Sequence, residues 1–351
     1  MKPAPTNPKP PTGHPKILVL QLKRIGDTIL TAPALAALRQ RYPEAKITLV
    51  VADSSRELLP AFSTVTDSLV YLRGGNNSKL WWQLIFSSYD ICLDFTGTDR
   101  SALFSLLSKA EQRLTFSWVK KSPARRLFYN RFVESSVHER HTVDHYLDLL
   151  GGLNIPFAPG PVQLDLPEWT RKKCHQLLEA RHLGGSFALI HPGTARPEKY
   201  WLPERWAEVI TRLERDYALP CVITGGNDQF EQDHLAAIRK AMPANLPPPL
   251  DLSGRIDLLT LAALTSQARV VLSVDSAPMH LAAAFGTPQV ALFGKTNPFH
   301  WRPRHERAFV IASGHPHPLA EFSPRMSGGS MGGITAQSVI EAVEKTMSFT
   351  F

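Results

Sequence analysis

The feature that most constrains the fold is an alternation of short apolar runs with helical patterns. Helical spacing of apolar residues is seen in segments such as APALAALRQRY and LPERWAEVITRLERDY. Between such segments, strand-like runs recur: KILVLQL (16–22), KITLVVA (46–52), DICLDFTG (90–97), FALIHPG (187–193), PCVITGG (220–226), VVLSVDSA (270–277) and PQVALFG (288–294). Near-continuous apolar strands that alternate with helices are typical of parallel sheets covered on both faces. We therefore predict an α/β fold.

The strand–helix pattern falls into two series separated by PFAPGPVQLDLPEWTRKK (156–173), which is rich in proline and has no periodicity. Such a segment is typical of a linker. A chain of 351 residues also fits two domains at about 100–200 residues each. We predict a disordered, proline-rich tail at 1–15 and two doubly wound, Rossmann-like domains at 16–160 and 161–351. We expect these domains to face a cleft.

Several classes of protein are disfavoured by motifs that the sequence lacks. No G-x-G-x-x-G follows the first strand and no G-x-x-x-x-G-K-[ST] occurs, which argues against a dinucleotide oxidoreductase and a P-loop NTPase. No D-x-D pair is present to hold a divalent metal on a diphosphate, and we predict neither metal nor cofactor. Cys92, Cys174 and Cys221 are too few and too scattered for a disulfide framework. Cys92 and Cys221 lie in apolar, strand-like runs, where we expect buried, reduced thiols. No apolar window approaches the ~18 residues that span a bilayer, so we expect membrane contact to be peripheral.

The first polar strand end is Gly26-Asp27-Thr28, which follows KILVLQL in the turn before a helical pattern. Ligands of doubly wound sheets bind beyond the carboxyl ends of the strands. Asp27 can cap backbone N–H groups at the start of the helix, or it can act as a general base over the cleft. The residues alone leave both interpretations open.

Two more strand ends carry groups that suit a nucleotide. Thr194, Arg196 and Lys199 follow FALIHPG, where a hydroxyl and two cations can bind phosphate or can simply be solvated. Asn227 and Asp228 follow PCVITGG. Asp228 at that position can bond ribose hydroxyls, although an Asx-turn explains it equally well.

The segment VDSAPMHLAAAFG is the sharpest of these patterns. Pro278 fits the first turn of a helix, and the backbone N–H groups of Ser276 and Ala277 would then point beyond the strand. A helix N-terminus favours an anion, so a diphosphate is the expected guest. His280 would lie one turn into the helix, where it can reach the diphosphate or the sugar, or can be structural.

The net charge is +8, and part of the excess lies between positions 113 and 140, with seven Lys/Arg against two Glu. A patch of this kind suits nucleic acid, anionic lipid or a phosphorylated substrate, or is a solvated surface without a partner. No recognition module or aromatic RNA motif accompanies the patch, so we do not expect nucleic acid as the partner.

Over residues 16–345 the sequence resembles the bacterial lipopolysaccharide heptosyltransferases of glycosyltransferase family 9. Three segments carry the resemblance: KILVLQLKRIGDTILTAPALAALRQRYPEAKITLVV, LIHPGTARPEKYWLPERWAEVI and VDSAPMHLAAAFGTPQVALFG. Two others, DICLDFTGTDRSALFSLLS and ERHTVDHYLDLLGGLNI, are similar to the branch that adds the third, inner-core heptose. GTARPEKYW is longer than the donor loop of that branch, so Arg196 and Glu198 receive no role, and nothing is carried over to SPRMSGGSMGGITAQ.

The resemblance implies a GT-B fold and an inverting transfer from ADP-heptose to a lipid A–core acceptor. It makes Asp27 the catalytic base, and it makes residues 16–160 the acceptor domain and 161–351 the nucleotide-sugar domain. The donor residues that it implies are Thr194 and Lys199 at the phosphates, Asp275 at the heptose, Ser276, Ala277 and His280 around the diphosphate, Asp228 at ribose and the Ile256 backbone at adenine. The candidates for the acceptor are Arg100, Lys120, Lys121, Arg125 and Arg126.

The same resemblance implies a cytoplasmic enzyme that is peripheral on the inner face of the inner membrane, with an anionic membrane surface as a partner. Two alternatives remain. One is a glycosyltransferase of the same family with another acceptor or sugar, and the other is a sugar-nucleotide-binding protein without turnover. Asp27 beside an intact donor site argues against the second.

Overall fold

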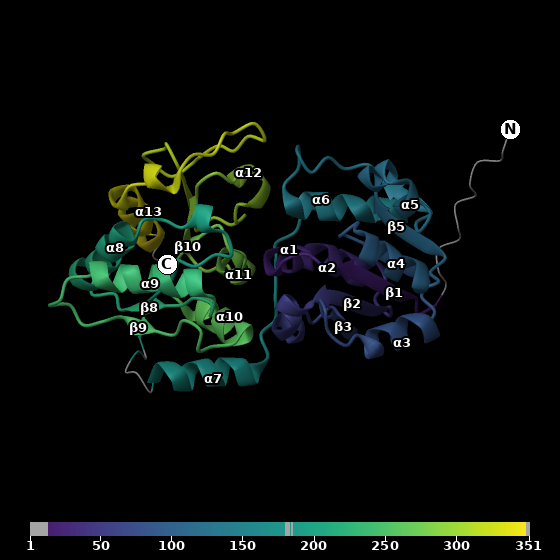
Figure 1. Ribbon diagram of the computed structural model, residues 1–351, viewed down its shortest axis with the longest axis horizontal. Coiled ribbons are helices and arrows are strands. Elements are labelled where there is room, and N and C mark those ends of the chain that lie inside the picture. The colour runs from purple at the N-terminus through teal and green to yellow at the C-terminus, as the bar shows by residue number, and fades with distance from the viewer. Residues whose placement is uncertain (1–12, 180–182, 184, 349–351) are drawn as a thin grey trace. The chain divides into compact units, whose positions relative to one another are not determined.

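The computed structural model describes residues 13–179, 183 and 185–348 (Figure 1), so most of the predicted tail lies outside the described residues. The chain divides into two compact units, and the division falls between Val162 and Gln163, inside the proline-rich segment. Each unit is built around one parallel sheet.

The sheet of the first unit has the order β3-β2-β1-β4-β5-β6, and all its pairings are parallel. The strands are β1 (Lys16–Gln21), β2 (Lys46–Ala52), β3 (Asp67–Tyr71), β4 (Ile91–Asp94), β5 (Gln112–Phe116) and β6 (Arg131–Val133). In the central register, Ile17 lies opposite Ile47 on one side and Ile91 on the other. β1 is buried along its length after Lys16, which explains the apolar run at residues 17–20.

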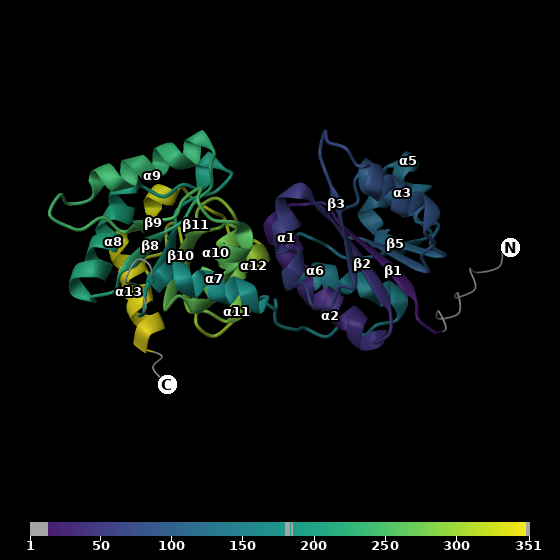
Figure 2. The ribbon, with the colours of Figure 1, turned by 90° about the horizontal axis from the view of Figure 1, so that it is seen from below.

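Helices cover both faces of this sheet (Figures 1 and 2). One face carries α1 (Ile25–Leu30), α2 (Ala32–Arg41) and α6 (Thr142–Leu149), and the other carries α3 (Ser78–Phe86), α4 (Asp99–Leu107) and α5 (Pro123–Arg126). The 3-10 segments are η1 (Asp53–Ala61), η2 (Ser117–Lys121) and η3 (Leu150–Leu153). Leu80 and Leu84 of α3 and Phe104 of α4 pack in one core cluster with Leu18 and Leu20 of β1. The apolar spacing in these helices therefore reflects burial against the sheet.

The second unit repeats this plan with the sheet order β12-β11-β10-β7-β8-β9. Its strands are β7 (Ala188–His191), β8 (Cys221–Ile223), β9 (Leu250–Asp251), β10 (Val270–Val274), β11 (Gln289–Phe293) and β12 (Ala308–Ala312). Its helices are α7 (Glu168–Glu179), α8 (Pro203–Asp216), α9 (Gln229–Ala241), α10 (Leu258–Gln267), α11 (Ala277–Phe285), α12 (Pro298–Trp301) and α13 (Ala336–Ser348), with 3-10 turns η4 (Pro197–Lys199) and η5 (Met331–Gly333).

In each sheet the strand order reverses beside the first strand of the unit. β1 lies between β2 and β4, and β7 lies between β8 and β10. Crossover connections leave such a position on opposite faces of the sheet, which opens a crevice at the carboxyl ends of the strands. The segments after β1 and β4 therefore converge in one unit, and the segments after β7 and β10 converge in the other.

The cysteines Cys92, Cys174 and Cys221 are buried free thiols, as expected from the sequence for Cys92 and Cys221. Among the residues with described placement, no helix is both long and apolar enough to cross a membrane.

Candidate functional site

Asp27 lies in the first turn of α1, where the structure corrects the sequence interpretation in two respects. The residue belongs to the helix and not to the turn before it, and the N-cap position is held by Arg24 without a side-chain bond. The Asp27 carboxylate instead accepts a hydrogen bond of 2.5 Å from the Tyr146 hydroxyl of α6. Interpreting Asp27 as a helix cap is therefore wrong. Its side chain is directed at α6 and remains 9% exposed.

Lys23 provides a positive charge next to this pair, and the sequence had not singled it out. Its ammonium lies 5.3 Å from the centre of the Tyr146 ring. Burial lowers the pKa of Lys23, and the carboxylates of Asp27 and Asp94 oppose that shift. Burial and the Lys23 charge lower the pKa of His145 to about 3, so His145 is neutral. The β1 strand end thus combines a carboxylate, a phenol and a partly buried ammonium.

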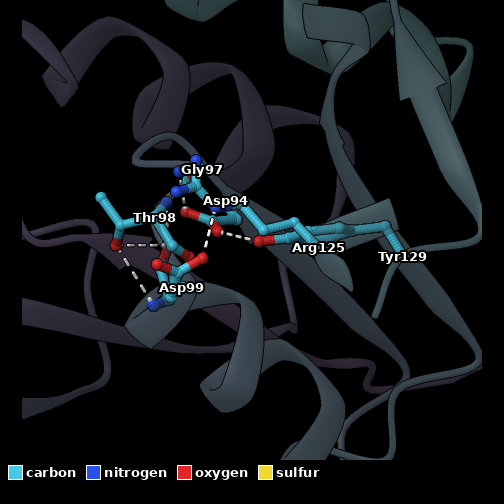
Figure 3. A network of polar contacts seen from close by, with 7 residues as sticks. Asp94, Gly97, Thr98, Asp99, Arg125 and Tyr129 are labelled. Atoms are coloured by element: carbon cyan, nitrogen blue, oxygen red, sulfur yellow. Dashed lines mark hydrogen bonds and ion pairs between the residues drawn. The ribbon is translucent and has the colours of Figure 1, made fainter. Parts of the chain in front are cut away.

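The neighbouring strand β4 ends in a buried carboxylate, Asp94, which is shown in Figure 3. Its oxygens accept hydrogen bonds from the Tyr129 hydroxyl at 2.5 Å and from the backbone N–H groups of Thr96 at 2.7 Å and Gly97 at 3.1 Å. Burial raises the pKa of Asp94, and these donors oppose the shift. The carboxylate thereby fixes the loop between β4 and α4, where Gly97 has a φ of 68° that favours glycine.

Part of the predicted basic patch holds the fold together. The Arg125 guanidinium is 2.5 Å from the Asp99 carboxylate and donates to the Gly97 carbonyl at 3.3 Å. Arg113 donates to the carbonyls of Phe128 at 2.9 Å and Ala110 at 2.7 Å. A charge bound in this way is held by its own chain, and it is less available to a ligand.

The other predicted cations of this unit are exposed on its surface. Arg100 lies over the Tyr71 ring at 4.5 Å, and Lys120 lies over the Phe132 ring at 5.1 Å. Lys121 and Arg126 are also exposed. These four side chains remain candidates for binding an anionic group.

In the second unit the structure joins two sequence-predicted residues directly. The Lys199 ammonium lies 2.5 Å from the Asp275 carboxylate and 3.3 Å from its backbone carbonyl. Both side chains are largely buried, at 14% and 8% exposed. The loop after β7 and the segment after β10 therefore meet in one ion pair at the reversal point of this sheet.

Helix α11 begins directly after Asp275 and Ser276. Ala277 is its first residue, Pro278 lies in the first turn, and Ser276 is the N-cap residue without a side-chain capping bond. The Ser276 hydroxyl donates to the Val274 carbonyl at 3.2 Å. His280 is buried within the first turns. A nine-residue helix that begins beside a lysine and a carboxylate is a geometry that suits a diphosphate linked to a sugar.

Glu231 is a buried carboxyl group that the sequence analysis missed. A Cβ atom at Gly193 would lie 1.4 Å from a Glu231 oxygen, and one at Gly226 would lie 2.7 Å from the other. Both glycines are therefore required where the loops after β7 and β8 approach α9. Burial raises the pKa of Glu231 to about 7, and the Gly226 backbone N–H opposes the shift. In the sequence, the glycines that follow β7 and β8 were the signal that could have pointed to this carboxyl group.

The remaining donor candidates lie around this carboxyl group or beyond it. Asp228 is the N-cap of α9 and accepts from the Glu231 backbone N–H at 3.1 Å, which is the structural alternative left open by the sequence. Thr194 is buried in the loop after β7. Ile256 is half-buried between β9 and α10. His191 is 3.8 Å from Glu231, but burial lowers its pKa to about 4, so that contact joins a neutral imidazole to the carboxyl group.

Comparison with known proteins gives a family match over most of the chain. Residues 78–327 match the model of glycosyltransferase family 9 (heptosyltransferase). The chain is 26% identical over 339 residues to lipopolysaccharide heptosyltransferase 3 of Escherichia coli, an alignment that covers 92% of this chain and 96% of that protein.

Solved structures agree with the architecture. A glycosyltransferase family 9 protein from Veillonella parvula superimposes with a TM-score of 0.83 at 23% identity, covering 96% of this chain and 98% of that one. The ADP-heptose lipopolysaccharide heptosyltransferase II of E. coli superimposes with a TM-score of 0.78 at 23% identity, covering 95% and 98%. Together with the two parallel sheets, these likenesses confirm the predicted fold class, an α/β GT-B fold with two doubly wound units.

Proposed function

Since the chain belongs to glycosyltransferase family 9, we propose that it transfers heptose from ADP-heptose to the inner core of lipopolysaccharide. The observation that carries this proposal is the family match over residues 78–327, which includes the segments after β4, β7 and β10. The similarity to a heptosyltransferase 3 over 92% of the chain favours addition of the third heptose. The enzyme is thus a lipopolysaccharide heptosyltransferase.

We assign the donor to the second unit. The α11 N-terminus at Ser276 and Ala277 and the Lys199 ammonium would bind the two phosphates, since helix amides and a fixed cation stabilise the charge that develops on departing ADP. Asp275, which Lys199 holds, would accept hydrogen bonds from the heptose. Thr194 and His280 complete this assignment near the diphosphate, with Asp228 at the ribose and the Ile256 backbone at adenine.

We assign proton transfer to Asp27 of the first unit. Its carboxylate would take the proton of an acceptor hydroxyl as that oxygen attacks the anomeric carbon of the heptose. The new carbon–oxygen bond forms on the face opposite the diphosphate, and ADP leaves with the electron pair of the broken bond. The configuration at the anomeric carbon therefore inverts.

A lipid A–core acceptor is anchored in a membrane, whereas ADP-heptose is soluble in water, so the transfer must occur at a membrane surface. We therefore propose that the enzyme works as a peripheral protein on the cytoplasmic face of the inner membrane. Its exposed cations Arg100, Lys120, Lys121 and Arg126 suit the phosphates of such an acceptor and anionic headgroups.

A direct assay tests the function. The purified protein is incubated with ADP-heptose and with core acceptors that carry either two heptoses or a completed inner core, and ADP release and product mass are measured. We expect ADP release and a gain of one heptose only with the acceptor that lacks the third heptose. Other ADP- and UDP-sugars serve as donor controls. Binding of ADP-heptose without transfer to any acceptor would instead support a binding protein without turnover.

Tyr146 is expected to position the catalytic carboxylate. Tyr146→Phe removes the hydroxyl that donates to Asp27 at 2.5 Å but keeps the ring that packs against Phe95. A hydrogen bond to a charged group contributes roughly 1.5–3 kcal/mol, so we expect kcat to fall by about tenfold or more. An unchanged kcat would give Tyr146 only a packing role.

The exposed cations of η2 and α5 are expected to contribute to acceptor binding. A triple variant replaces Lys120, Lys121 and Arg126 with glutamine. Its apparent affinity for the phosphorylated acceptor should fall roughly tenfold, while its affinity for ADP stays unchanged. Arg125 is left intact because it is bound to Asp99 and Gly97. Acceptor affinity of the wild type should fall with added salt, given a Debye length of about 10 Å at 0.1 M.

The control for this variant removes three exposed cations from the second unit: Arg171, Lys172 and Lys240 to glutamine. It should leave acceptor affinity unchanged. If the first triple variant keeps normal acceptor kinetics but loses binding to anionic vesicles, the cations serve the membrane alone. If the first triple variant loses only binding to duplex DNA or RNA, the assignment of a phosphorylated acceptor as the partner is contradicted.

A further inference from the structure

Helix α3 exposes large apolar side chains. Trp82 is 66% exposed and Phe86 is 68% exposed, and their rings lie 5.3 Å apart. Ile85 of α3 and Leu103 and Leu106 of the adjacent α4 are exposed as well. We call these five side chains the α3–α4 apolar face. Single exposed apolar residues are common, but a cluster of them marks an interaction surface.

The α3–α4 apolar face is not needed to hold the helices on the sheet. α3 already buries Leu80 and Leu84, and α4 buries Phe104, all in one core cluster with β1. Residues 82 and 86 lie about half a turn around the helix from positions 80 and 84. Each helix therefore has one apolar side packed on the sheet and a second one turned outward.

The layer that carries this face is strongly basic. Helices α3, α4 and α5 cover the same face of the first sheet (Figures 1 and 2). Segments 78–86, 99–109 and 117–127 contain seven cations and one acid: Lys79, Arg100, Lys109, Lys120, Lys121, Arg125 and Arg126 against Asp99. Asp99 is paired with Arg125, so the other six cations have no acid to balance them within these three segments.

We propose that the α3–α4 apolar face docks on an anionic lipid bilayer, with Trp82 and Phe86 entering the headgroup region and the surrounding cations facing the lipid headgroups. Aromatic side chains flanked by lysine and arginine are the chemistry of a membrane–water interface. A second copy of the chain fits less well, because a two-fold contact would set like charges against each other. The docking rests on the proposed function in one respect: an acceptor anchored in a membrane requires the enzyme to reach the membrane surface.

Vesicle binding tests the docking without donor, acceptor or turnover. The full chain and a Trp82→Ser, Phe86→Ser double variant are sedimented with vesicles of phosphatidylglycerol and phosphatidylcholine, and with pure phosphatidylcholine vesicles. We expect the wild type to prefer the anionic vesicles and the double variant to bind them at least about tenfold more weakly, which corresponds to about 1.4 kcal/mol. ADP affinity and the unfolding temperature should not change, because both side chains are exposed.

The matched control is Trp169→Ser, which removes a 54% exposed tryptophan from α7 of the second unit. It should bind anionic vesicles like the wild type. The proposal is overturned if the double variant also binds like the wild type, or if the wild type binds neither kind of vesicle. A wild-type dimer that becomes monomeric in the double variant would assign the face to a second copy. An inactive protein that still docks through Trp82 and Phe86 would contradict only the proposed function.

Discussion

Asp27→Asn is expected to lower the rate of heptose transfer by about 10²–10⁴-fold, the usual cost of losing a general base. The amide has nearly the shape of the carboxylate, and its oxygen can still accept the hydrogen bond that Tyr146 donates at 2.5 Å. It cannot take a proton from the acceptor hydroxyl. The residues proposed to bind the donor all belong to the other unit. Affinity for ADP-heptose should therefore stay within about twofold of the wild type, which is less than the tenfold change in Kd that corresponds to about 1.4 kcal/mol.

The measurements are single-turnover transfer, calorimetric titration with ADP-heptose, and thermal unfolding. Asp53→Asn is a suitable control, because Asp53 is an exposed acid of the same unit that pairs with Arg56 across one helical turn. The control should turn over normally. If Asp27→Asn is also normal, the proton is taken by another group and Asp27 has only the structural bond to Tyr146. A lower unfolding temperature together with lost activity would be resolved by Asp27→Glu, which keeps a base on a longer side chain.

Strand ends were predictable from the sequence because apolar strands and the polar residues after them are local patterns. Asp27 and Lys199 were singled out as candidates in this way, whereas Asp275 was named from the family resemblance. Their partners depend on the topology. Tyr146 is 119 residues from Asp27, and its position on α6 follows only once α1 and α6 pack on the same face of the sheet. No spacing in the chain signals that contact.

Charge counting had a similar limit. The excess of cations between positions 113 and 140 was visible in the sequence, but the sequence could not separate the solvated charges from those used by the fold. Arg125 is bound to Asp99, and Arg113 is bound to two backbone carbonyls. Glu231 could not be recognised from the sequence, because its burial depends on contacts between distant segments. Gly193 and Gly226 leave room for its carboxyl group, and only the folded backbone brings these two glycines together.

Lys199→Met should have the second-largest effect. It removes the cation proposed to meet the diphosphate, and a hydrogen bond to a charged group contributes roughly 1.5–3 kcal/mol. We therefore expect the Kd for ADP to rise by about 10- to 150-fold. The same change leaves the largely buried Asp275 carboxylate without the ammonium that lies 2.5 Å away. Breaking a buried pair from one side is destabilising, so the free energy of unfolding should also fall.

The two consequences can be separated with Asp275→Asn, because the pair is isolated in a double-mutant cycle. In the double variant the lost stability of Lys199→Met should be largely restored, since the uncompensated carboxylate is gone. If Lys199 binds the donor phosphates, ADP should still bind the double variant at least about tenfold more weakly than it binds Asp275→Asn alone, a gap of about 1.4 kcal/mol. If both bind ADP equally, Lys199 acts only by holding Asp275, and the anion site is reduced to the start of α11. Arg196→Gln, which alters an exposed cation of the same loop, controls for the loss of charge and should leave ADP affinity unchanged.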